Sequence, residues 1–362
     1  MTSPNIIMFE HCIIDDISQK FKVIDDIGSG SYGIVQKCFD TESKRIVAIK
    51  KIKILADNDG FPQSSLREVS ILSKLNHDNI VKLYQVLFCK KDRGIYLVFE
   101  YCEFDLNGLI YGNVSVALDS RFFHTIMKQI LLSLHFLRVK RIIHRDLKPA
   151  NVFINKKNIL KIGDFGLARD LIPNEKYTSN VVTQWYRPPE LLLGCEKYGT
   201  EVDMWSAGCI FYEILTKKHL FSTRDKNDSS QLQTIFKICG TPNDENWPNW
   251  RDCGNNTMIL NYRYTSTLVP HLQSTIPEAE HGIIDLLVSM LELNPANRIT
   301  PENAVNHSYF RSSNVSLDPN ALPILSMPDM HSNRINKSHN QNDNQNLNNN
   351  NNTRPKRIEP CN

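Results

Sequence analysis

The sequence predicts an α+β fold built from two packed lobes, a small β-rich lobe followed by a larger helical lobe. The first observation is size, because 362 residues, 41% of them hydrophobic, exceed what one simple core usually serves. The second is that the first part of the chain carries its apolar residues in short β-branched runs. The third is that later apolar residues recur at helical spacing over long segments.

The first lobe is expected to be a small, mostly antiparallel sheet that one helix interrupts. A short leader covers residues 1–20, and from Phe21 onward β-branched runs such as Ile-Val-Ala-Ile at 46–49 are typical of strands. Between residues 60 and 75 the apolar spacing becomes helical, after a proline, Pro62, that suits a helix start. We therefore expect a single helix among the strands.

The second lobe is expected to be helical. Residues 121–137 carry a broad apolar stripe, and residues 202–215 are apolar nearly all round, which indicates a buried helix. Recognisable motifs end near Phe310, and Asn and Ser dominate residues 311–362, which include a run of asparagines at 348–352. Such a segment is too polar to bury a core, so we predict that 311–362 is disordered.

Composition excludes several classes of protein. Lys and Arg number 42 against 39 Asp and Glu, and a net charge of +3 is too small to indicate direct binding to nucleic acid or to a membrane surface. No apolar run approaches the ~18 residues of a membrane-spanning helix. The nine cysteines show no Cys-x-x-Cys spacing, which favours a reduced cytosolic or nuclear compartment.

A glycine-containing stretch between two expected strands is the first candidate site. Its residues are Ile27, Gly28, Ser29, Gly30, Ser31, Tyr32, Gly33, Ile34 and Val35. Glycines at this spacing let backbone amides lie close over phosphate oxygens. The plain alternative is a glycine-containing hairpin, and a dinucleotide-binding fold would need a helix after the glycines. The strand context favours a loop that covers phosphates.

A lysine at the end of the next strand is the second candidate. Lys50 closes the run Val-Ala-Ile-Lys, fifteen residues after Val35, and would reach phosphate oxygens if a carboxylate held it in place. Glu68, directly after Arg67 in the expected helix, is that carboxylate. A lysine at a strand end is more often simply exposed, but this strand followed by a helical Arg-Glu is a much less common coincidence. We expect a Lys50–Glu68 ion pair.

The most specific motif is the loop from His144 to Asn151, which Asp-Phe-Gly follows with Asp164 thirteen residues after Asn151. Phosphoryl transfer needs a carboxylate that orients a hydroxyl and accepts its proton, and Asp146 is the candidate. Lys148 would neutralise charge on the moving phosphoryl group. Asn151 and Asp164 carry the oxygen ligands that Mg²⁺ prefers. A chance loop followed by a turn would not place separate motifs in this order.

Residues 21–310 resemble a eukaryotic protein kinase. The resemblance implies the bilobal kinase fold, with an N-lobe over about 21–101, a C-lobe over about 106–310, and ATP bound with Mg²⁺ between them. It assigns further residues to the nucleotide: Ala48, the gatekeeper Phe99, the hinge residues Glu100 and Cys102, Asp105 near the ribose, and Phe153 beneath adenine. It also implies that Glu190, at the end of the activation segment, pairs with Arg298, and that Asp203 anchors the catalytic loop.

The segment from Pro62 to Glu68 resembles the cyclin-contacting helix of cyclin-dependent kinases, although an ordinary kinase helix would also carry the glutamate. This resemblance implies that Arg67, Arg145 and Arg169 converge, and their like charges would repel unless an anion sits among them. Thr178, phosphorylated by an activating kinase, would supply the anion. A mitogen-activated kinase would carry Thr-x-Tyr there, which this segment lacks.

The same family resemblance extends to regulation and specificity. Thr183 should bridge Asp146 and Lys148 through its hydroxyl. Val182 and Arg187 match the pair that favours a proline after the phosphorylated Ser or Thr. Ser31 and Tyr32 align with the inhibitory phosphorylation sites of cell-cycle members, although such residues also serve only to shape the loop.

Among cyclin-dependent kinases the chain is most similar to the transcriptional branch, because cell-cycle members usually carry alanine in place of Pro188 and Val or Ile in place of Phe61. That branch phosphorylates Ser-Pro sites in the RNA polymerase II C-terminal repeat with a T-like or K-like cyclin. It implies a nuclear location, with the cytoplasm as a second possibility, and residues 354–357 form a short basic cluster that is either solvated or a nuclear-import signal. A cell-cycle kinase is the alternative.

Departures from the family pattern also carry expectations. Phe153 stands where leucine is usual, which predicts altered inhibitor sensitivity rather than lost ATP binding. Gln184 stands before Trp185 where leucine is usual. A pseudokinase scaffold would lack a catalytic residue, and none is missing. We expect that Lys50–Glu68 alignment depends on the cyclin, so that the isolated chain is nearly idle.

Overall fold

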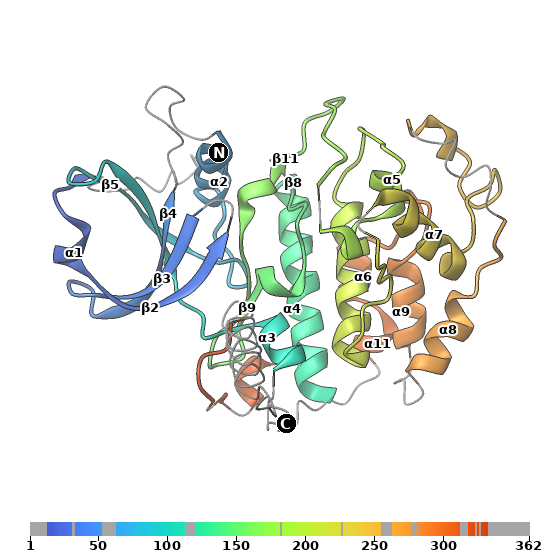
Figure 1. Cartoon of the computed structure of the whole chain (residues 1–362). Coiled ribbons are helices and arrows are strands. Elements are labelled where there is room, and N and C mark those ends of the chain that lie inside the picture. Colours follow the sequence, from blue (N-terminus) through green and yellow to red (C-terminus); the bar gives the residue numbers. More distant parts are fainter. Residues whose placement is uncertain are drawn as a thin grey trace, which may run out of the picture.

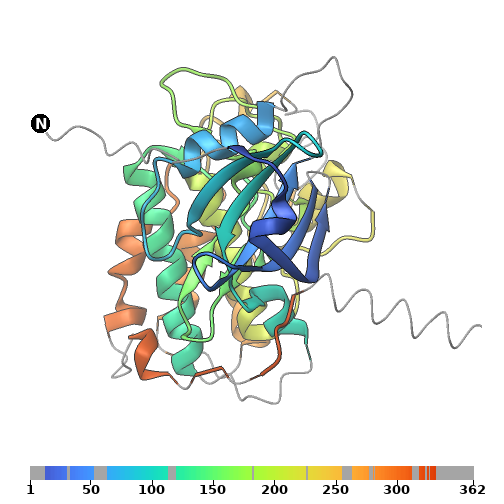
Figure 2. The same cartoon turned by 90° about the vertical axis from the view of Figure 1, so that its left-hand side faces the viewer.

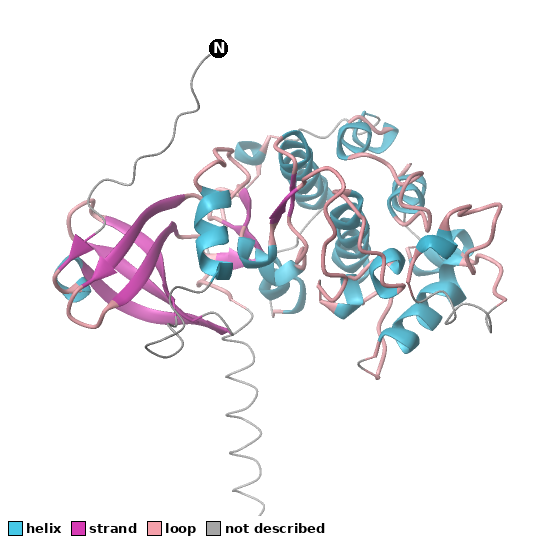
Figure 3. Cartoon of the chain, turned by 90° about the horizontal axis from the view of Figure 1, so that it is seen from above, coloured by secondary structure: helices cyan, strands magenta, loops and turns pink. Residues whose placement is uncertain are grey.

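The computed structural model describes residues 13–30, 33–52, 63–112, 120–181, 183–225, 227–254, 263–276, 280, 282–311, 318–322, 324–325 and 327–331. A sheet-rich N-lobe lies beside a larger helical C-lobe (Figure 1). Coloured by secondary structure and seen from above, the strands gather at one end and most of the helices at the other (Figure 3). The predicted two-lobed α+β fold is confirmed.

The N-lobe is a six-stranded sheet in the order β1-β5-β6-β4-β3-β2, antiparallel except where β1 meets β5. The strands are β1 (Ile13–Ile14), β2 (Phe21–Gly30), β3 (Gly33–Asp40), β4 (Arg45–Ile52), β5 (Leu83–Cys89) and β6 (Gly94–Glu100). Along β4 the buried residues Val47, Ile49 and Ile52 pack inside the lobe. The sheet faces the viewer in Figure 2. Its register places Lys50 between Val35 of β3 and Leu97 of β6.

The described part of the predicted leader belongs to this lobe. Residues 13–20 form β1 and α1 (Ile17–Lys20), and Asp16 caps α1 by accepting a hydrogen bond from the Ser18 N–H. Parallel pairing of Ile13 and Ile14 with Phe88 and Cys89 adds a strand at the sheet edge. The sheet therefore begins before Phe21.

Helix α2 (Gln63–Leu72) lies beside the sheet at its junction with the C-lobe (Figure 1). Ser65, Glu68 and Leu72 are buried on one face, at spacings that bring side chains together on a helix. Leu66, in contrast, is 54% exposed. The helix packs against η2 (Phe165–Leu167). Because η2 directly follows Asp164, the position of α2 affects the position of this candidate metal ligand.

The C-lobe is built around two long helices whose positions match the predicted stripes. They are α4 (Ser120–Val139) and α6 (Glu201–Thr216), and α6 is buried nearly all round. The remaining helices are α3 (Leu106–Tyr111), α5 (Pro189–Leu192), α7 (Asp228–Cys239), α8 (Leu268–Thr275), α9 (Ile283–Met290), α10 (Pro301–Val305) and α11 (Ser308–Arg311). Within the described ranges, no helix is both long and apolar enough to cross a membrane.

Short elements connect these helices and carry most of the motifs. The strands are β7 (Phe104–Asp105), β8 (Ile142–Ile143), β9 (Val152–Ile154), β10 (Leu160–Ile162) and β11 (Arg169–Asp170). The 3₁₀ turns, besides η2, are η1 (Pro149–Asn151), η3 (Gln184–Tyr186), η4 (Trp250–Asp252) and η6 (Pro319–Ala321). Because β7 pairs with β9 and β8 with β11, the catalytic loop lies between two small ladders.

The described residues of 318–331, which we name the C-terminal segment, correct the prediction of disorder over 311–362. Leu322 and Leu325 are buried, and the Met330 N–H donates to Glu103 O at 2.9 Å. A Cβ on Gly108 of α3 would lie 3.0 Å from Met330 O, so glycine makes room for this contact. The composition of residues 311–362 gave little weight to a few apolar side chains, and these side chains pack on the folded domain.

Candidate active site

Asp203, in the first turn of α6, anchors the catalytic loop. The Asp203 carboxylate accepts hydrogen bonds from the N–H groups of His144 and Arg145, at 2.8 and 2.9 Å. Burial raises the pKa of Asp203, and these donors and His144 oppose the rise. Arg145 and Asp164 adopt left-handed backbone conformations, with φ of 67° and 58°. Non-glycine residues held this way are typical of functional sites.

Four side chains meet at the centre of this loop. Lys148 Nζ lies 2.7 Å from Asp146 Oδ2, and Thr183 Oγ1 donates to Asp146 Oδ1 at 3.1 Å. Lys148 also donates to Thr183 Oγ1 at 3.1 Å, so the hydroxyl lies between the two charged groups as expected. Asn151 Nδ2 donates to the backbone oxygen of Asp146 at 2.8 Å and to its Oδ2 at 3.0 Å. The carboxylate is therefore held from three sides.

The expected ion pair of the N-lobe is present in the chain alone. Lys50 Nζ lies 3.0 and 2.9 Å from the Glu68 oxygens and 3.5 Å from Asp164 Oδ1. Burial alone would lower the pKa of Lys50, but the two carboxylates raise it above its usual value. Burial also raises the pKa of Glu68, which Lys50 opposes. The pair is formed in a conformation in which α2 packs against η2, and the dependence of this alignment on a cyclin stays a prediction.

The donor set fits a hard divalent cation. Asp164 Oδ1 is buried and accepts no hydrogen bond from any residue that the structure describes. Asn151 directs its amide nitrogen at Asp146, which leaves its amide oxygen as the second candidate ligand. Among the described residues, no cluster of three or more His, Cys, Asp or Glu side chains could hold a metal alone. Oxygen ligands from phosphates would be needed to complete the coordination.

The glycine-containing stretch is a hairpin of β2 and β3, with Gly28 opposite Val35, Ser29 opposite Ile34 and Gly30 opposite Gly33. Ile27 is buried, whereas Ile34 is 46% exposed. Ser31 and Tyr32, the predicted inhibitory sites, lie outside the described residues. Strands flank the glycines on both sides, which agrees with the predicted context.

The residues predicted to contact adenine and ribose lie on β4, β6, β7 and β9, and Cys102 lies in the link between β6 and β7. Ala48 is paired with Phe99, which is 8% exposed, and Cys102 is also buried. Glu100 is used structurally, because its carboxylate accepts from the Lys82 N–H at 2.6 Å and pairs with Lys161 at 3.0 Å.

Phe153 and Asp105 show how this edge is packed. A Cβ on Gly163 would lie 2.7 Å from the Phe153 ring, so the large ring fits because glycine precedes Asp164. Asp105 caps α3 by accepting from the Gly108 N–H at 2.6 Å, and its own N–H donates to Met330 O at 3.0 Å. The C-terminal segment therefore borders the predicted ribose contact.

The C-terminal segment also contacts the N-lobe, through a cluster of charged and aromatic side chains that was not expected from the sequence. Asp329 accepts a hydrogen bond from the Tyr101 hydroxyl and forms an ion pair with Lys37 of β3. The Lys37 ammonium also lies 4.7 Å from the centre of the Tyr101 ring. Burial would raise the pKa of Asp329, but hydrogen bonds from Lys37 and Tyr101 lower it. No motif in the sequence predicts this contact.

The three arginines predicted to converge are close enough for their charges to interact. Burial lowers the pKa of Arg169 to about 10, with a further lowering from the nearby charges of Arg145 and Arg67. Arg145 donates to Leu167 O and to the Tyr198 hydroxyl, while its Nη2 is buried without a hydrogen-bond partner among the described residues. Thr178 is exposed, and its carbonyl accepts from the Tyr198 hydroxyl at 2.6 Å.

Two residues in the last part of the activation segment contact the start of α7. Arg187 Nη1 lies 2.9 Å from Asp228 Oδ1, and Gln184 Nε2 donates to Asn227 O at 2.7 Å. Gln184 therefore gains a contact that leucine could not make. Val182, the other residue predicted to favour proline, lies outside the described residues.

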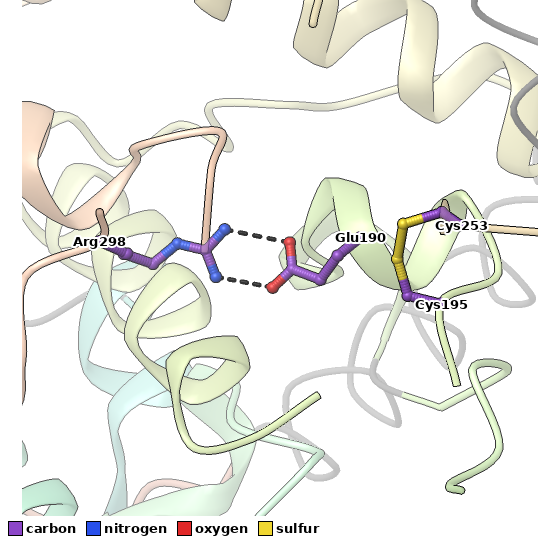
Figure 4. The surroundings of a disulfide bond; sticks show 4 residues. All are labelled: Glu190, Cys195, Cys253 and Arg298. Atoms are coloured by element: carbon purple, nitrogen blue, oxygen red, sulfur yellow. Dashed lines mark hydrogen bonds and ion pairs between the residues drawn. A yellow bond between two sulfur atoms is a disulfide. The ribbon is translucent and has the colours of Figure 1, made fainter. Parts of the chain in front are cut away.

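The end of the activation segment is fixed by a buried ion pair beside a disulfide (Figure 4). Arg298 Nη1 and Nη2 lie 2.7 and 3.0 Å from the Glu190 carboxylate oxygens, as the resemblance implied. The disulfide joins Cys195 and Cys253, which are 58 residues apart. Cysteine spacing carried no signal for it, and it departs from the free thiols usual in a reduced compartment.

Comparisons with known proteins agree with this geometry. Residues 21–310 match the protein kinase domain family. Cyclin-dependent kinase C-1 of Oryza sativa is 38% identical over 84% of this chain, and this chain spans 60% of its length. Serine/threonine-protein kinase ppk23 of Schizosaccharomyces pombe is 40% identical over 86% of this chain and 76% of its own length.

A solved structure gives the same result. The crystal structure of the yeast RNA Pol II CTD kinase CTDK-1 complex contains a chain that superposes with a TM-score of 0.76 and 33% identity. The match covers 83% of this chain and 96% of that one. The chain belongs to the protein kinase family.

Proposed function

We propose that this protein is a cyclin-dependent serine/threonine kinase that transfers the γ-phosphoryl group of ATP to Ser-Pro or Thr-Pro sites, with the RNA polymerase II C-terminal repeat as its substrate. The observation that carries the proposal is the closed arrangement of Asp146, Lys148, Thr183 and Asn151, beside the formed Lys50–Glu68 pair. A scaffold that only binds partners would not need to hold a carboxylate in this way.

Each residue has a role that follows from its position. Asp146 orients the substrate hydroxyl and accepts its proton, while Lys148 stabilises negative charge on the transferred group. Lys50 binds the α and β phosphates, and Glu68 keeps its ammonium in place. Asp164 and Asn151 would hold Mg²⁺, which when bound neutralises phosphate charge. Thr183 fixes the distance between Asp146 and Lys148.

Dependence on a cyclin is supported by the surface of α2 and by the arginine cluster. Leu66 is 54% exposed on the helix that also carries Glu68 and Arg67, so a partner that covers Leu66 acts directly on the ion pair. Among the residues that the structure describes, Arg145 Nη2 is buried and has no hydrogen-bond partner, and a phosphate on nearby Thr178 would supply charge-assisted hydrogen bonds. The rice relative is named a cyclin-dependent kinase and the yeast complex an RNA Pol II CTD kinase, which supports a cyclin partner. The proposal includes a T-like or K-like cyclin and a nuclear location, as the family resemblance implies.

The test is to purify the full chain with its co-purifying cyclin and assay peptides of the polymerase repeat. We expect phosphate on serines that precede proline, and a loss of about tenfold or more in kcat/KM when that proline is replaced by alanine. Equal rates on both peptides would contradict the proline preference. Recovery of a cell-cycle cyclin would favour the alternative of a cell-cycle kinase. Absence of a thermal shift with Mg²⁺ and ATP would favour a scaffold.

A further inference from the structure

The Cys195–Cys253 disulfide joins two loops that are 58 residues apart in the sequence (Figure 4). Cys195 follows α5, and its N–H donates to Glu190 O at 3.0 Å, next to the buried pair with Arg298. Cys253 follows η4, and its N–H donates to Trp250 O at 3.3 Å. The Cα atoms are 4.5 Å apart. The bond therefore fixes residue 195 to a second anchored loop.

The residues directly after Cys195 hold the activation segment at two successive positions. Glu196 O accepts from the Tyr177 N–H at 2.8 Å. The Tyr198 hydroxyl donates to Thr178 O at 2.6 Å and accepts from Arg145 Nη1 at 2.9 Å. The rings of Tyr177 and Tyr198 also pack together, 5.5 Å between centres. A restraint on the motion of residues 196–198 therefore also restrains the motion of the backbone around Thr178.

The two cysteines differ from the other described cysteines in pairing, and Cys195 differs also in access. Cys38, Cys89, Cys102, Cys209 and Cys239 are free and buried. Burial raises the pKa of Cys38 to about 11, which disfavours the reactive thiolate. Cys195 is half-buried and Cys253 is 4% exposed. An oxidant can therefore reach Cys195, and Cys253 is placed to react with it next.

We propose that Cys195 and Cys253 form a reversible redox site, oxidised by a peroxide, that holds residues 196–198 and through them the backbone of Thr178. The Cys195 thiolate attacks one peroxide oxygen, which breaks the O–O bond and gives a sulfenic acid and hydroxide, and the hydroxide takes up a proton to become water. The Cys253 thiolate then attacks that sulfur, expels hydroxide that takes up a proton to become water, and forms the S–S bond. A dithiol reductant returns both thiols by exchange and is itself oxidised.

The first experiment identifies the bond in the full-length chain. The protein is treated with hydrogen peroxide or with dithiothreitol, alkylated under denaturing conditions and digested. We expect a peptide linking Cys195 to Cys253 after peroxide, and two alkylated peptides after dithiothreitol. Alkylation of both residues after peroxide, or pairing of either with another cysteine, would overturn the proposal.

The second experiment tests the link to the activation segment without relying on catalysis. Hydrogen exchange is measured on a peptide covering residues 174–181, which contains the Tyr177 N–H bonded to Glu196 O. We expect about fivefold slower exchange in the oxidised chain than in the reduced chain. Equal exchange rates in the two states would show that the disulfide does not restrain the activation segment, and would overturn the proposal.

Two variants sharpen the result. Cys253→Ser should abolish the difference between oxidised and reduced samples, whereas Cys239→Ser, at a buried free cysteine of α7, should leave it unchanged. Persistence of the difference in Cys253→Ser would assign the response to oxidation elsewhere in the chain and would overturn the proposal. If Cys253→Ser does not fold, the comparison of hydrogen exchange between the oxidised and reduced wild-type chain still tests the proposal, because both samples have the same sequence.

Discussion

The two sides of the catalytic loop are assembled in different ways. On the nucleotide side, Lys50 lies among the opposite charges of Glu68 and Asp164. On the activation-segment side, burial lowers the pKa of Arg169, and the nearby positive charges of Arg145 and Arg67 lower it further. Opposite charges within one chain can form a stable buried arrangement without help, whereas like charges need an anion from outside. The comparison predicts that the first side is preformed and the second is conditional.

The largest expected effect is at Asp146, which lies between the two sides. Replacing it in Asp146→Asn removes the proton acceptor while keeping the size of the side chain, so phosphoryl transfer should fall by about 10³-fold. Nucleotide binding should be unchanged, because Lys50 and Glu68 are untouched. Steady-state rates and an ATP titration by thermal shift would measure both. Asp170→Asn, at an exposed ion pair with Lys74, is the matched control and should leave the rate nearly unchanged.

The second effect tests whether the nucleotide side is preformed. Glu68→Gln removes the carboxylate nearest to Lys50 and leaves that of Asp164 at 3.5 Å, and breaking a buried pair costs about 3 kcal/mol. We expect the thermal shift caused by Mg²⁺ and ATP to be largely lost even without a cyclin. Glu42→Gln is the control, because the Lys20–Glu42 pair is at the surface. An unchanged shift in Glu68→Gln would mean that the pair does not support nucleotide binding in the isolated chain.

The third effect tests the conditional side. Thr178→Ala removes the hydroxyl that would carry phosphate, so activation by an upstream kinase should be lost, at a cost of about ten- to a hundredfold in kcat/KM. Ser179→Ala, one residue along the same segment, should respond to the activating kinase like the wild type. A wild-type chain already at full rate before phosphorylation would contradict the view that the arginines wait for an anion.

The sequence was most informative where chemistry constrains neighbouring residues. The loop from His144 to Asn151 and the pair Lys50–Glu68 could be predicted because each role demands one residue type at one spacing. The structure shows that Glu68 aligns through packing of α2 on η2, a contact that no periodicity predicts. Cys195 and Cys253 could not be paired from the sequence, because 58 residues separate them and loop geometry alone brings them together.

The C-terminal segment shows the opposite error, in which composition predicted too little structure. Asparagine content governed the interpretation of residues 311–362, whereas docking depends on single residues such as Met330 and Asp329. The room for Met330 comes from Gly108, a residue more than 200 positions earlier in the chain, and composition cannot report such a fit. Local polarity therefore limits core formation but does not exclude attachment to a core that already exists.

The smallest expected effect concerns this segment, which reaches the preformed side through Lys37. Asp329→Ala removes the ion pair with Lys37 and the hydrogen bond from Tyr101, both partly buried, so docking should weaken by about 1–2 kcal/mol. Hydrogen exchange at the Met330 N–H, which donates to Glu103 O, should speed up by about tenfold. Asp318→Ala removes the cap of η6 in the same segment without touching Lys37, and should leave that amide protected. Equal exchange in the two variants would show that main-chain pairing alone holds the segment, and that the N-lobe contact is incidental.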